Sequence, residues 1–190
     1  MSQTASFGTR DLALVGLGAG VIASLGAIPP IAIGVLPVPI TLQSLGVMLV
    51  GLMFGPKRGA LACLTFLTLV AAGLPVLAGG RGGLAVFAGP TAGYMLAWVP
   101  AAYCTGILAI QAETLQRPLV RGIAYLAANI VGGIMVVHLG GILWLAAASH
   151  INVTTAMLGS LAFVPGDLIK AVLVVVVVQR VEGMLTLPRL

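Results

Sequence analysis

One acid and one base, Asp167 and Lys170, interrupt the last long apolar stretch of the chain. Between Gly122 and Gln179 they are the only residues that carry a permanent charge. They are three positions apart, so on a helix they lie on one face, about one turn from each other. Because a charge in a bilayer is costly unless it is paired or lines a polar cavity, the two side chains are candidates for a binding site. The alternative is an ion pair that only locks two helices together.

The composition indicates that the surroundings of this pair are a lipid bilayer. Of the 190 residues, 60% are hydrophobic and 7% are charged, and the mean hydropathy is +1.19. An ordinary water-soluble domain has about 25% charged residues, so we expect one membrane-embedded domain that covers residues 1–190. The net charge of +5 does not indicate nucleic-acid binding, because the basic residues are scattered singly instead of forming a stripe.

Charges, prolines and glycines divide the apolar residues into six predicted helical spans, which makes the expected fold all-α. The spans cover roughly residues 11–29, 42–55, 58–74, 91–111, 119–147 and 158–180. A helix needs about 20 residues to cross the hydrocarbon, so we expect the short second and third spans to be tilted, broken or shielded by neighbours. The fifth span is long, and two glycine pairs give it places to bend.

The basic residues orient these six spans. Seven of the nine Lys and Arg fall at span ends on one side, namely Arg10, Lys57, Arg58, Arg117, Arg121, Arg180 and Arg189. The loops on the other side, at about 30–41, 75–90 and 148–157, contain a single basic residue, Arg81. Such a bias is typical of the cytoplasmic side. We therefore predict a multi-pass protein of the cell membrane with both termini in the cytoplasm.

Two of the outer loops have compositions typical of an ordered cover over a site. The first contains Pro29-Pro30 and the segment 37–41, and its prolines prevent a regular helix. The second contains the glycine run 79–83 around Arg81, where a backbone can approach a ligand closely. The alternative is that both are flexible external connections. Asp167 is predicted about 20 Å above the cytoplasmic edge, so it can meet both loops in one outward-facing cavity.

The chemistry available to such a cavity is binding. A carboxylate, an ammonium and a guanidinium suit a small solute that has N–H donors and a carbonyl or carboxylate group. Motifs of metallopeptidases, serine hydrolases and phosphate-binding loops are absent, so we expect no enzyme, no catalytic residue and no cofactor. His138 and His150 lack metal-ligand spacing, so no metal site is expected, and His138 is predicted to form a helix–helix hydrogen bond. Any role driven by ATP needs a partner protein.

The first span carries small residues at helical spacing. Ala19, Ala23 and Ala27 repeat every four residues, and Gly16, Gly20 and Ser24 form an adjacent stripe. Small residues at this spacing let another helix approach closely in lipid. The approaching helix can belong to a partner subunit or to the same bundle, and the sequence supports both equally.

Five motifs follow one another along nearly the whole chain. They are Pro-Val-Pro-Ile-Thr-Leu-Gln at 37–43, Gly-Pro-Lys-Arg-Gly at 55–59, Gly-Leu-Pro at 73–75 leading into the glycine run 79–83, Gly-Pro-Thr-Ala-Gly-Tyr at 89–94, and Phe-Val-Pro-Gly-Asp-Leu-Ile-Lys at 163–170. In this combination the chain resembles the BioY family, the biotin-specific substrate-capture (S) components of energy-coupling factor (ECF) transporters. The resemblance implies a six-helix membrane bundle that binds biotin near the external face. It also implies a transmembrane coupling subunit and a pair of cytoplasmic ATPases as partners, with biotin as the transported substrate and not a cofactor.

The resemblance assigns roles to individual residues. Asp167 and Lys170 match the polar pair that contacts biotin. Arg81 matches a polar position that is often Asn in the family, so it either holds the valerate carboxylate or faces external water. Tyr94 and Gln43 match motif positions and are further candidates for substrate binding. The lid over the site is assigned to Pro37, Val38, Pro39, Ile40 and Thr41, and docking on the coupling subunit is assigned to Ala19 and Ala23.

Two alternatives to this function stay open from the sequence. One is an S component for a different vitamin. The other is a self-sufficient secondary carrier that uses the Asp167–Lys170 pair as its gate.

Overall fold

The computed structural model describes residues 7–32, 37–148 and 150–184, and within these ranges the regular structure is helical. The elements are α1 (Thr9–Gly26), α2 (Gln43–Ala71), the 3-10 helix η1 (Leu84–Ala88), α3 (Ala92–Leu96), α4 (Trp98–Glu113), α5 (Pro118–Ala128), the π-helix η2 (Asn129–Val136), α6 (Val137–Ala148), α7 (Val153–Leu161) and α8 (Val164–Met184). The predicted all-α class is therefore confirmed for the described residues. Residues 33–36 of the predicted proline loop and Arg189 lie outside them.

The long helix α2 is a hairpin. The side chain of Gln43, at its start, donates to the carbonyl of Val76 at 3.1 Å and accepts from the backbone N–H of Ala78 at 2.9 Å. A straight helix from Gln43 to Ala71 would carry its ends about 43 Å apart, too far for these bonds. The first half of α2 therefore corresponds to the predicted span 42–55 and the second half to the predicted span 58–74.

Gly55 makes the reversal inside α2 possible. Its backbone has φ 76° and ψ −178°, a conformation that is essentially restricted to glycine. Pro56 follows, so the second half begins with a residue that suits the first turn of a helix. The two halves touch beside the turn, since a Cβ placed on Gly59 would lie 2.9 Å from the carbonyl oxygen of Val50. The Gly-Pro motif thus ends one helix and starts the next.

Within the described ranges, four helical segments are long and apolar enough to cross a membrane: Thr9–Gly26, Gln43–Ala71, Ala92–Glu113 and Pro118–Ala148. A fifth forms if α7 and α8, which are bent by 49° relative to each other, count as one span. The segment Pro118–Ala148 joins α5, η2 and α6, and it confirms the single long span predicted at 119–147. These segments give the chain the helices of a membrane protein.

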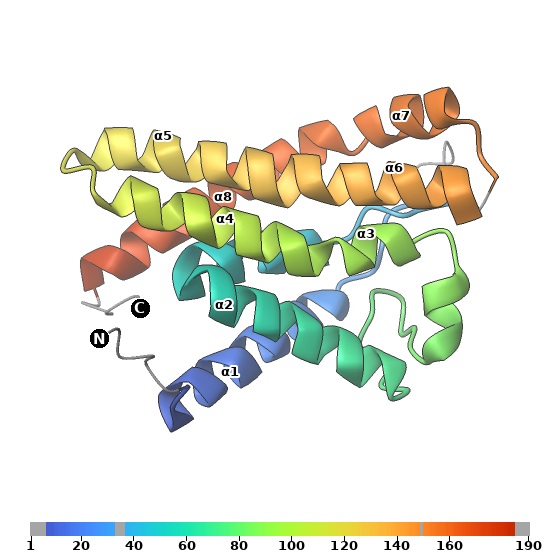
Figure 1. Cartoon of the computed structure of the whole chain (residues 1–190), viewed down its shortest axis with the longest axis horizontal. Coiled ribbons are helices and arrows are strands. Elements are labelled where there is room, and N and C mark those ends of the chain that lie inside the picture. Colours follow the sequence, from blue (N-terminus) through green and yellow to red (C-terminus); the bar gives the residue numbers. More distant parts are fainter. Residues whose placement is uncertain (1–6, 33–36, 149, 185–190) are drawn as a thin grey trace, which may run out of the picture.

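The start of α1 and the end of α8 lie at the same end of the molecule, together with the turn between α4 and α5 (Figure 1). Ion pairs tie the helices together at this end. Arg58, just after the α2 turn, pairs with Asp11 of α1. On α5, Tyr125 donates to Glu182 of α8 at 2.8 Å, and Arg121 lies 3.7 Å from the same carboxylate. The basic residues that were predicted to face the cytoplasm, where the structure describes them, therefore lie near helix ends that cluster together.

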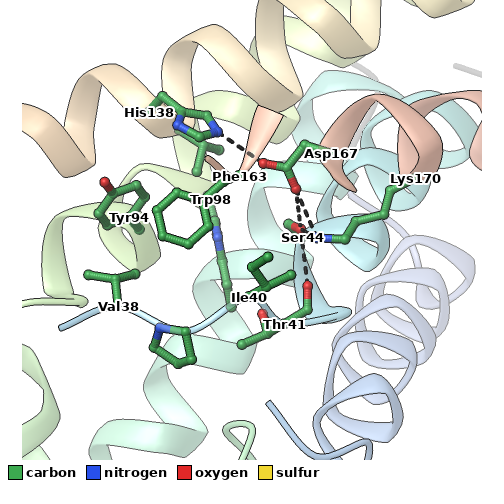
Figure 2. A pocket seen from close by; sticks show the side chains of 12 residues that line it. Val38, Ile40, Thr41, Ser44, Tyr94, Trp98, His138, Phe163, Asp167 and Lys170 are labelled. Carbon is green, nitrogen blue, oxygen red and sulfur yellow. Dashed lines mark hydrogen bonds and ion pairs between the residues drawn. The ribbon is translucent and has the colours of Figure 1, made fainter. Parts of the chain in front are cut away.

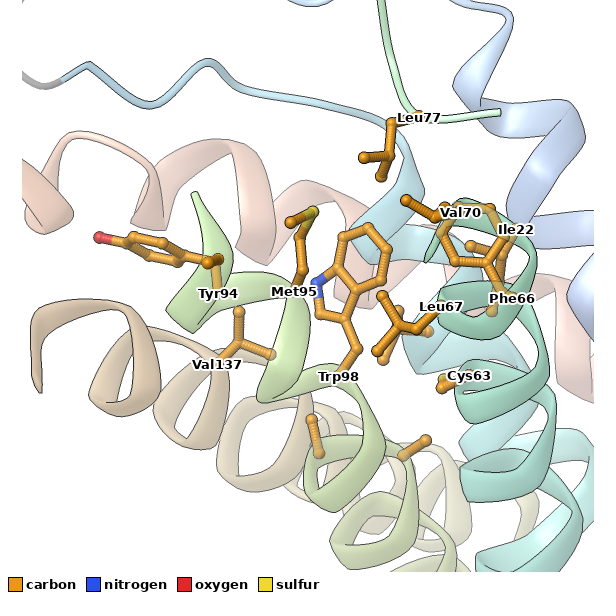
Figure 3. Packing of buried hydrophobic residues seen from close by; sticks show 14 of the residues in the cluster. Ile22, Cys63, Phe66, Leu67, Val70, Leu77, Tyr94, Met95, Trp98 and Val137 are labelled. Atoms are coloured by element: carbon orange, nitrogen blue, oxygen red, sulfur yellow. The ribbon is translucent and has the colours of Figure 1, made fainter. Parts of the chain in front are cut away.

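The apolar core at the opposite half of the bundle is centred on α2, α3 and α4. In Figure 3 the indole of Trp98 lies between Met95 and the side chains of Phe66 and Leu67. The rings of Phe66 and Trp98 have centroids 5.8 Å apart. Burial of such large side chains is the main favourable term of folding, and here it fixes the α3–α4 segment that forms one wall of the site.

In this structure the alanine stripe of α1 packs toward the bundle, which is one of the two alternatives left open by the sequence. Ala19 is 2% exposed and belongs to the core, and Ala23 packs partly buried against that core. The exposed small residues are the neighbouring stripe, because a Cβ placed on Gly16 or Gly20 would meet no atom within 4 Å. Since α1 is apolar on all sides, its periodicity could not tell which stripe packs inward. Ala19 therefore does not lie on an outer surface of this structure.

Candidate functional site

A cavity lies where the lid segment meets α2, α3, α4, α6 and the start of α8 (Figure 2). Its volume is about 60 Å³. It is lined by Val38, Pro39, Ile40, Thr41, Ser44, Tyr94, Trp98, Val137, His138, Phe163, Asp167 and Lys170. The predicted pair Asp167 and Lys170 thus shares a cavity with four of the five predicted lid residues and with Tyr94. Elements that are far apart in sequence all contribute to it.

Three side chains surround the carboxylate of Asp167. The ammonium of Lys170 donates to Oδ1 at 2.8 Å, and Ser44 lies 3.3 Å from the same oxygen. The imidazole Nε2 of His138 is 2.9 Å from Oδ2. Lys170 also donates to the Ser44 hydroxyl at 3.0 Å. The carboxylate is therefore held from α2, α6 and α8 at once, as the dashed lines of Figure 2 show.

The local sequence explains why the acid and the base point into the cavity. The bend between α7 and α8 falls at Ala162 and Phe163, and α8 begins at Val164. Asp167 lies in the first turn of α8, where the helix dipole stabilises a negative charge. Lys170 follows three residues later, so the two side chains meet on one helix face.

Hydrogen-bonding capacity remains in this cluster. Asp167 and Lys170 are each 8% exposed, so their unused polar groups cannot rely on bulk water. A carboxylate has about four acceptor positions and an ammonium has three donors. Among the described residues, Asp167 accepts from three partners and Lys170 donates to two. One acceptor position of the carboxylate and one donor of the ammonium therefore stay available, which suits a ligand that has both an N–H and a carbonyl.

The remaining walls of the cavity are aromatic and aliphatic. Tyr94 and Trp98 lie one helical turn apart and are 8% and 5% exposed. The ring of Phe163 meets that of Tyr94 edge-on, with centroids 6.2 Å apart. The Tyr94 hydroxyl bonds to Ser160 of α7 at 2.6 Å, so Tyr94 presents its ring to the cavity. The site thus has one polar wall and otherwise apolar walls, as small-molecule sites usually do.

Residues 38–41 of the predicted lid line the cavity on the side of the predicted outer loops. Ile40 and Ile31 form an antiparallel bridge with backbone hydrogen bonds of 2.8 and 2.9 Å. Val38 is buried against the core, whereas Pro37 is exposed and does not line the cavity. This backbone bridge holds residues 38–41 as an extended segment over Asp167 and Lys170.

Two predicted site residues do not line this cavity. Gln43 is 1% exposed, and its amide bonds to the backbone of Ile22, Val76 and Ala78. Its neighbour Ser44 points into the cavity instead. Arg81 is exposed, and its Nε donates to the carbonyl of Ala78 at 3.3 Å. Gln43 therefore stabilises the outer loop through its backbone, and Arg81 lies on that loop.

The structure adds residues to the site that sequence reasoning did not assign to it. These are Ser44, Trp98, Val137, His138 and Phe163. The predicted helix–helix hydrogen bond of His138 is confirmed, and its acceptor is Asp167. Trp98 follows Tyr94 by four residues, a spacing that signals a shared helix face. Ser44 and His138 have no such local signal, because their partner lies on another helix.

Among the residues described by the structure, no three His, Cys, Asp or Glu side chains gather in a way that could hold a metal ion. What the arrangement offers chemically is recognition of a small, largely apolar solute through one carboxylate and one ammonium.

A model of the BioY family matches residues 1–186 of the chain. A biotin transporter BioY from Rhizobium etli is 51% identical over 165 residues, which are 86% of this chain and 88% of the relative. Another, from Rhodobacter capsulatus, is 45% identical over 181 residues, 90% of this chain and 93% of the relative. Among solved structures, the crystal structure at 2.1 Å of the S-component for biotin from an ECF-type ABC transporter matches with a TM-score of 0.83 and 36% identity. That match covers 96% of this chain and 95% of the solved one.

Proposed function

Because the chain belongs to the BioY family, we propose that it is the substrate-capture (S) component for biotin of an ECF transporter. Membership makes it a membrane transporter subunit and not an enzyme. The observation that carries the substrate assignment is the juxtaposition of the Asp167 carboxylate and the Lys170 ammonium in a cavity with apolar walls. The relatives are biotin transporters by name, and the cavity of this chain has the chemistry that biotin needs.

The fit to biotin follows from its functional groups. Its ureido ring has two N–H donors and one carbonyl, which match the open acceptor of Asp167 and the open donor of Lys170. Its thioether ring and aliphatic tail match the walls formed by Trp98, Val137 and Phe163. The cavity volume is about 60 Å³, which is too small for biotin. We therefore expect the cavity to widen when biotin binds, and residues 38–41 to move as the lid.

The loop that carries Arg81 completes the substrate assignment. Arg81 is exposed, and its guanidinium has donors left beyond the bond to Ala78, so the role that we propose for it is to bind the valerate carboxylate of biotin. Gln43 acts on the substrate indirectly, because it accepts from Ala78 and so holds the same loop. Tyr94 contributes its ring as a wall.

The topology that we propose has six membrane spans, with both termini in the cytoplasm. The α2 hairpin supplies two of them, and α1, the α3–α4 segment, the α5–α6 segment and the bent α7–α8 pair supply the others. The even number agrees with the position of the start of α1 and the end of α8 at one end of the bundle (Figure 1). The whole chain is then one capture domain in the cytoplasmic membrane.

Release of biotin requires partners. The chain has no phosphate-binding motif, so a transmembrane coupling subunit and a pair of cytoplasmic ATPases drive the transport step. The surface for docking is the outward stripe of α1 that contains Gly16 and Gly20, with Ala23 at its edge. Ala19 is excluded from this surface by its burial in the core.

The test is isothermal titration of the detergent-purified protein with biotin, with thiamin and riboflavin as controls. Tight one-to-one binding of biotin alone is the expected result. Binding of another vitamin in its place identifies a different S component, and no binding by a folded sample overturns the assignment. Proteoliposomes that contain only this chain are expected to bind labelled biotin at their surface without accumulating it, whereas accumulation identifies a self-sufficient carrier.

A further inference from the structure

We propose that His138 is a positioning residue that makes ligand capture depend on pH. In this mechanism a neutral His138 holds the Asp167 carboxylate in the geometry that a ligand N–H requires. Protonation of His138 ties up that carboxylate and weakens capture. The inference deepens the proposed function and rests on it, since it concerns the same site.

The contact that carries this inference joins α6 to α8. The Nε2 atom of His138 lies 2.9 Å from Oδ2 of Asp167, and His138 is 8% exposed. Beside a carboxylate, a neutral imidazole carries its proton on Nε2 and donates it. Within the described part of the chain, the other ring nitrogen, Nδ1, is buried without a hydrogen-bond partner. All the polar contacts of the ring that the structure shows are therefore directed at Asp167.

Aromatic neighbours hold the imidazole in this orientation. The ring of Tyr94 meets it edge-on, with centroids 6.0 Å apart and planes at 84°. The ring of Phe163 lies on another side, with centroids 6.1 Å apart. Figure 2 shows the imidazole directed at Asp167 on the far side of the cavity from the lid segment. Because its position is fixed by packing, His138 orients the carboxylate instead of following it.

The charges around His138 determine the sign of the pH effect. The titratable groups that face it are Asp167 and Lys170 of α8 and Tyr94 of α3, and α6 itself contains no other titratable residue. With His138 neutral, the charges of Asp167 and Lys170 balance. With His138 protonated, the cluster gains one positive charge, and the bond to Asp167 becomes an ion pair and strengthens. A ligand N–H then competes with a stronger donor for the same carboxylate.

Affinity is therefore expected to fall on acidification. Histidine is the side chain whose charge ordinarily changes between about pH 5 and pH 8. In the proposed topology the cavity lies in the outer half of the membrane, so the pH that matters is the external one.

The experiment measures the affinity of biotinamide, whose lack of a carboxylate keeps the ligand charge constant, by titration calorimetry across this pH range. The wild-type protein is expected to bind about tenfold more weakly at about pH 5.5 than at about pH 8. His138→Gln keeps an N–H donor without a titratable ring, so it is expected to bind within about threefold of wild type at about pH 8 with a flat profile. His138→Phe keeps the ring and loses the donor, so it is expected to bind at least about tenfold more weakly at every pH.

The matched control is His150→Gln, because His150 is the other histidine of the chain and lies in the exposed loop between α6 and α7. It is expected to retain the wild-type profile. A flat wild-type profile overturns the inference, and so does a His138→Gln variant that keeps the wild-type pH dependence. A His138→Phe variant that binds like wild type at about pH 8 overturns it as well, because the ring then acts by packing alone.

Two control measurements distinguish a variant that fails to fold, or a wrong assignment of function, from a wrong role for His138. Thermal unfolding of each variant without ligand identifies any that fail to fold, and if His138→Phe does so, the wild-type and His138→Gln profiles still decide. Failure of the proposed function is recognised separately. Wild-type protein that binds neither biotin nor biotinamide at about pH 8 overturns both proposals, whereas binding with a flat profile overturns only the role of His138.

Discussion

The side-chain amide of Gln43 donates a 3.1 Å hydrogen bond to the carbonyl of Val76, 33 residues further along the chain. This bond joins the first residue of the α2 hairpin to the loop that follows its last turn. The same side chain accepts from Ala78 and donates to Ile22. One buried glutamine thereby fixes α1, both ends of α2 and the outer loop that carries Arg81.

We expect Gln43→Leu to lower the free energy of unfolding by about 2–4 kcal/mol, because three backbone groups lose a hydrogen-bond partner, in two buried contacts and one partly buried contact. Thermal unfolding in detergent measures the loss. Biotin affinity, measured where both proteins are folded, is expected to stay within about threefold of wild type. Unchanged stability with affinity reduced more than about tenfold would instead mean that Gln43 contacts the substrate directly.

Asp167→Asn is expected to weaken biotin binding at least tenfold, about 1.4 kcal/mol, because the amide replaces one acceptor by a donor that faces a ligand N–H. Titration calorimetry near neutral pH measures the change. Asp11→Asn is the matched control, since it also removes one acid from an ion pair, at the other end of the bundle. Equal affinities for the Asp167→Asn variant and wild type would mean that the ion pair only holds helices together and does not contact the ligand.

A double variant separates the two roles of the polar pair. Asp167→Leu combined with Lys170→Met removes both charges, and replacing a buried ion pair by apolar residues is often neutral or stabilising by about 1–4 kcal/mol. We expect the double variant to remain folded and to lose biotin binding by more than about a hundredfold, since neither ligand partner remains. Retained binding in this variant would rule out both side chains as ligand contacts.

Gly20→Leu is expected to abolish assembly with the coupling subunit while leaving biotin affinity unchanged. Gly20 is exposed and no atom lies within 4 Å of a Cβ placed on it, so the added side chain disturbs the outer face and not the fold. Co-purification with the coupling subunit measures assembly. Ala19→Leu is the contrasting variant, because Ala19 is in the core and overpacking there costs about 1–3 kcal/mol of stability. Normal assembly of the Gly20→Leu variant would show that docking uses another surface.

Hydropathy and charge placement were sufficient to predict the all-α class and the ion pair, but the bend between α7 and α8 falls inside the predicted span 158–180 and was not predicted. The Gly-Pro-Lys-Arg-Gly motif separated two short spans in the sequence, and Gly55 is the residue at which α2 reverses. The polar pair could be recognised because a charged side chain in a bilayer is costly unless it is paired or lines a polar cavity. The spacing of Asp167 and Lys170 also gave their mutual contact, since it depends only on helix geometry.

Contacts between helices could not be predicted in this way. Ser44 meets Asp167 across 123 residues, and His138 meets it across 29. Neither contact leaves a local pattern in the sequence. The inward face of α1 was also ambiguous, because the Ala19 stripe and the Gly16 stripe are both small and apolar. Packing decided between them, and packing depends on which helices are neighbours.

The bent pair α7–α8 has a consequence for how the protein matures. Asp167 and Lys170 lie in the last described helix, while Ser44 and the lid segment lie near the beginning of the chain. Chains are synthesised from the N-terminus, and earlier parts fold first. A nascent chain without α8 can already insert four of its long apolar segments, yet it lacks both charges of the site. The ability to capture a ligand is therefore expected to arise only after α8 has been synthesised, and a product truncated before α8 is expected not to bind the vitamin.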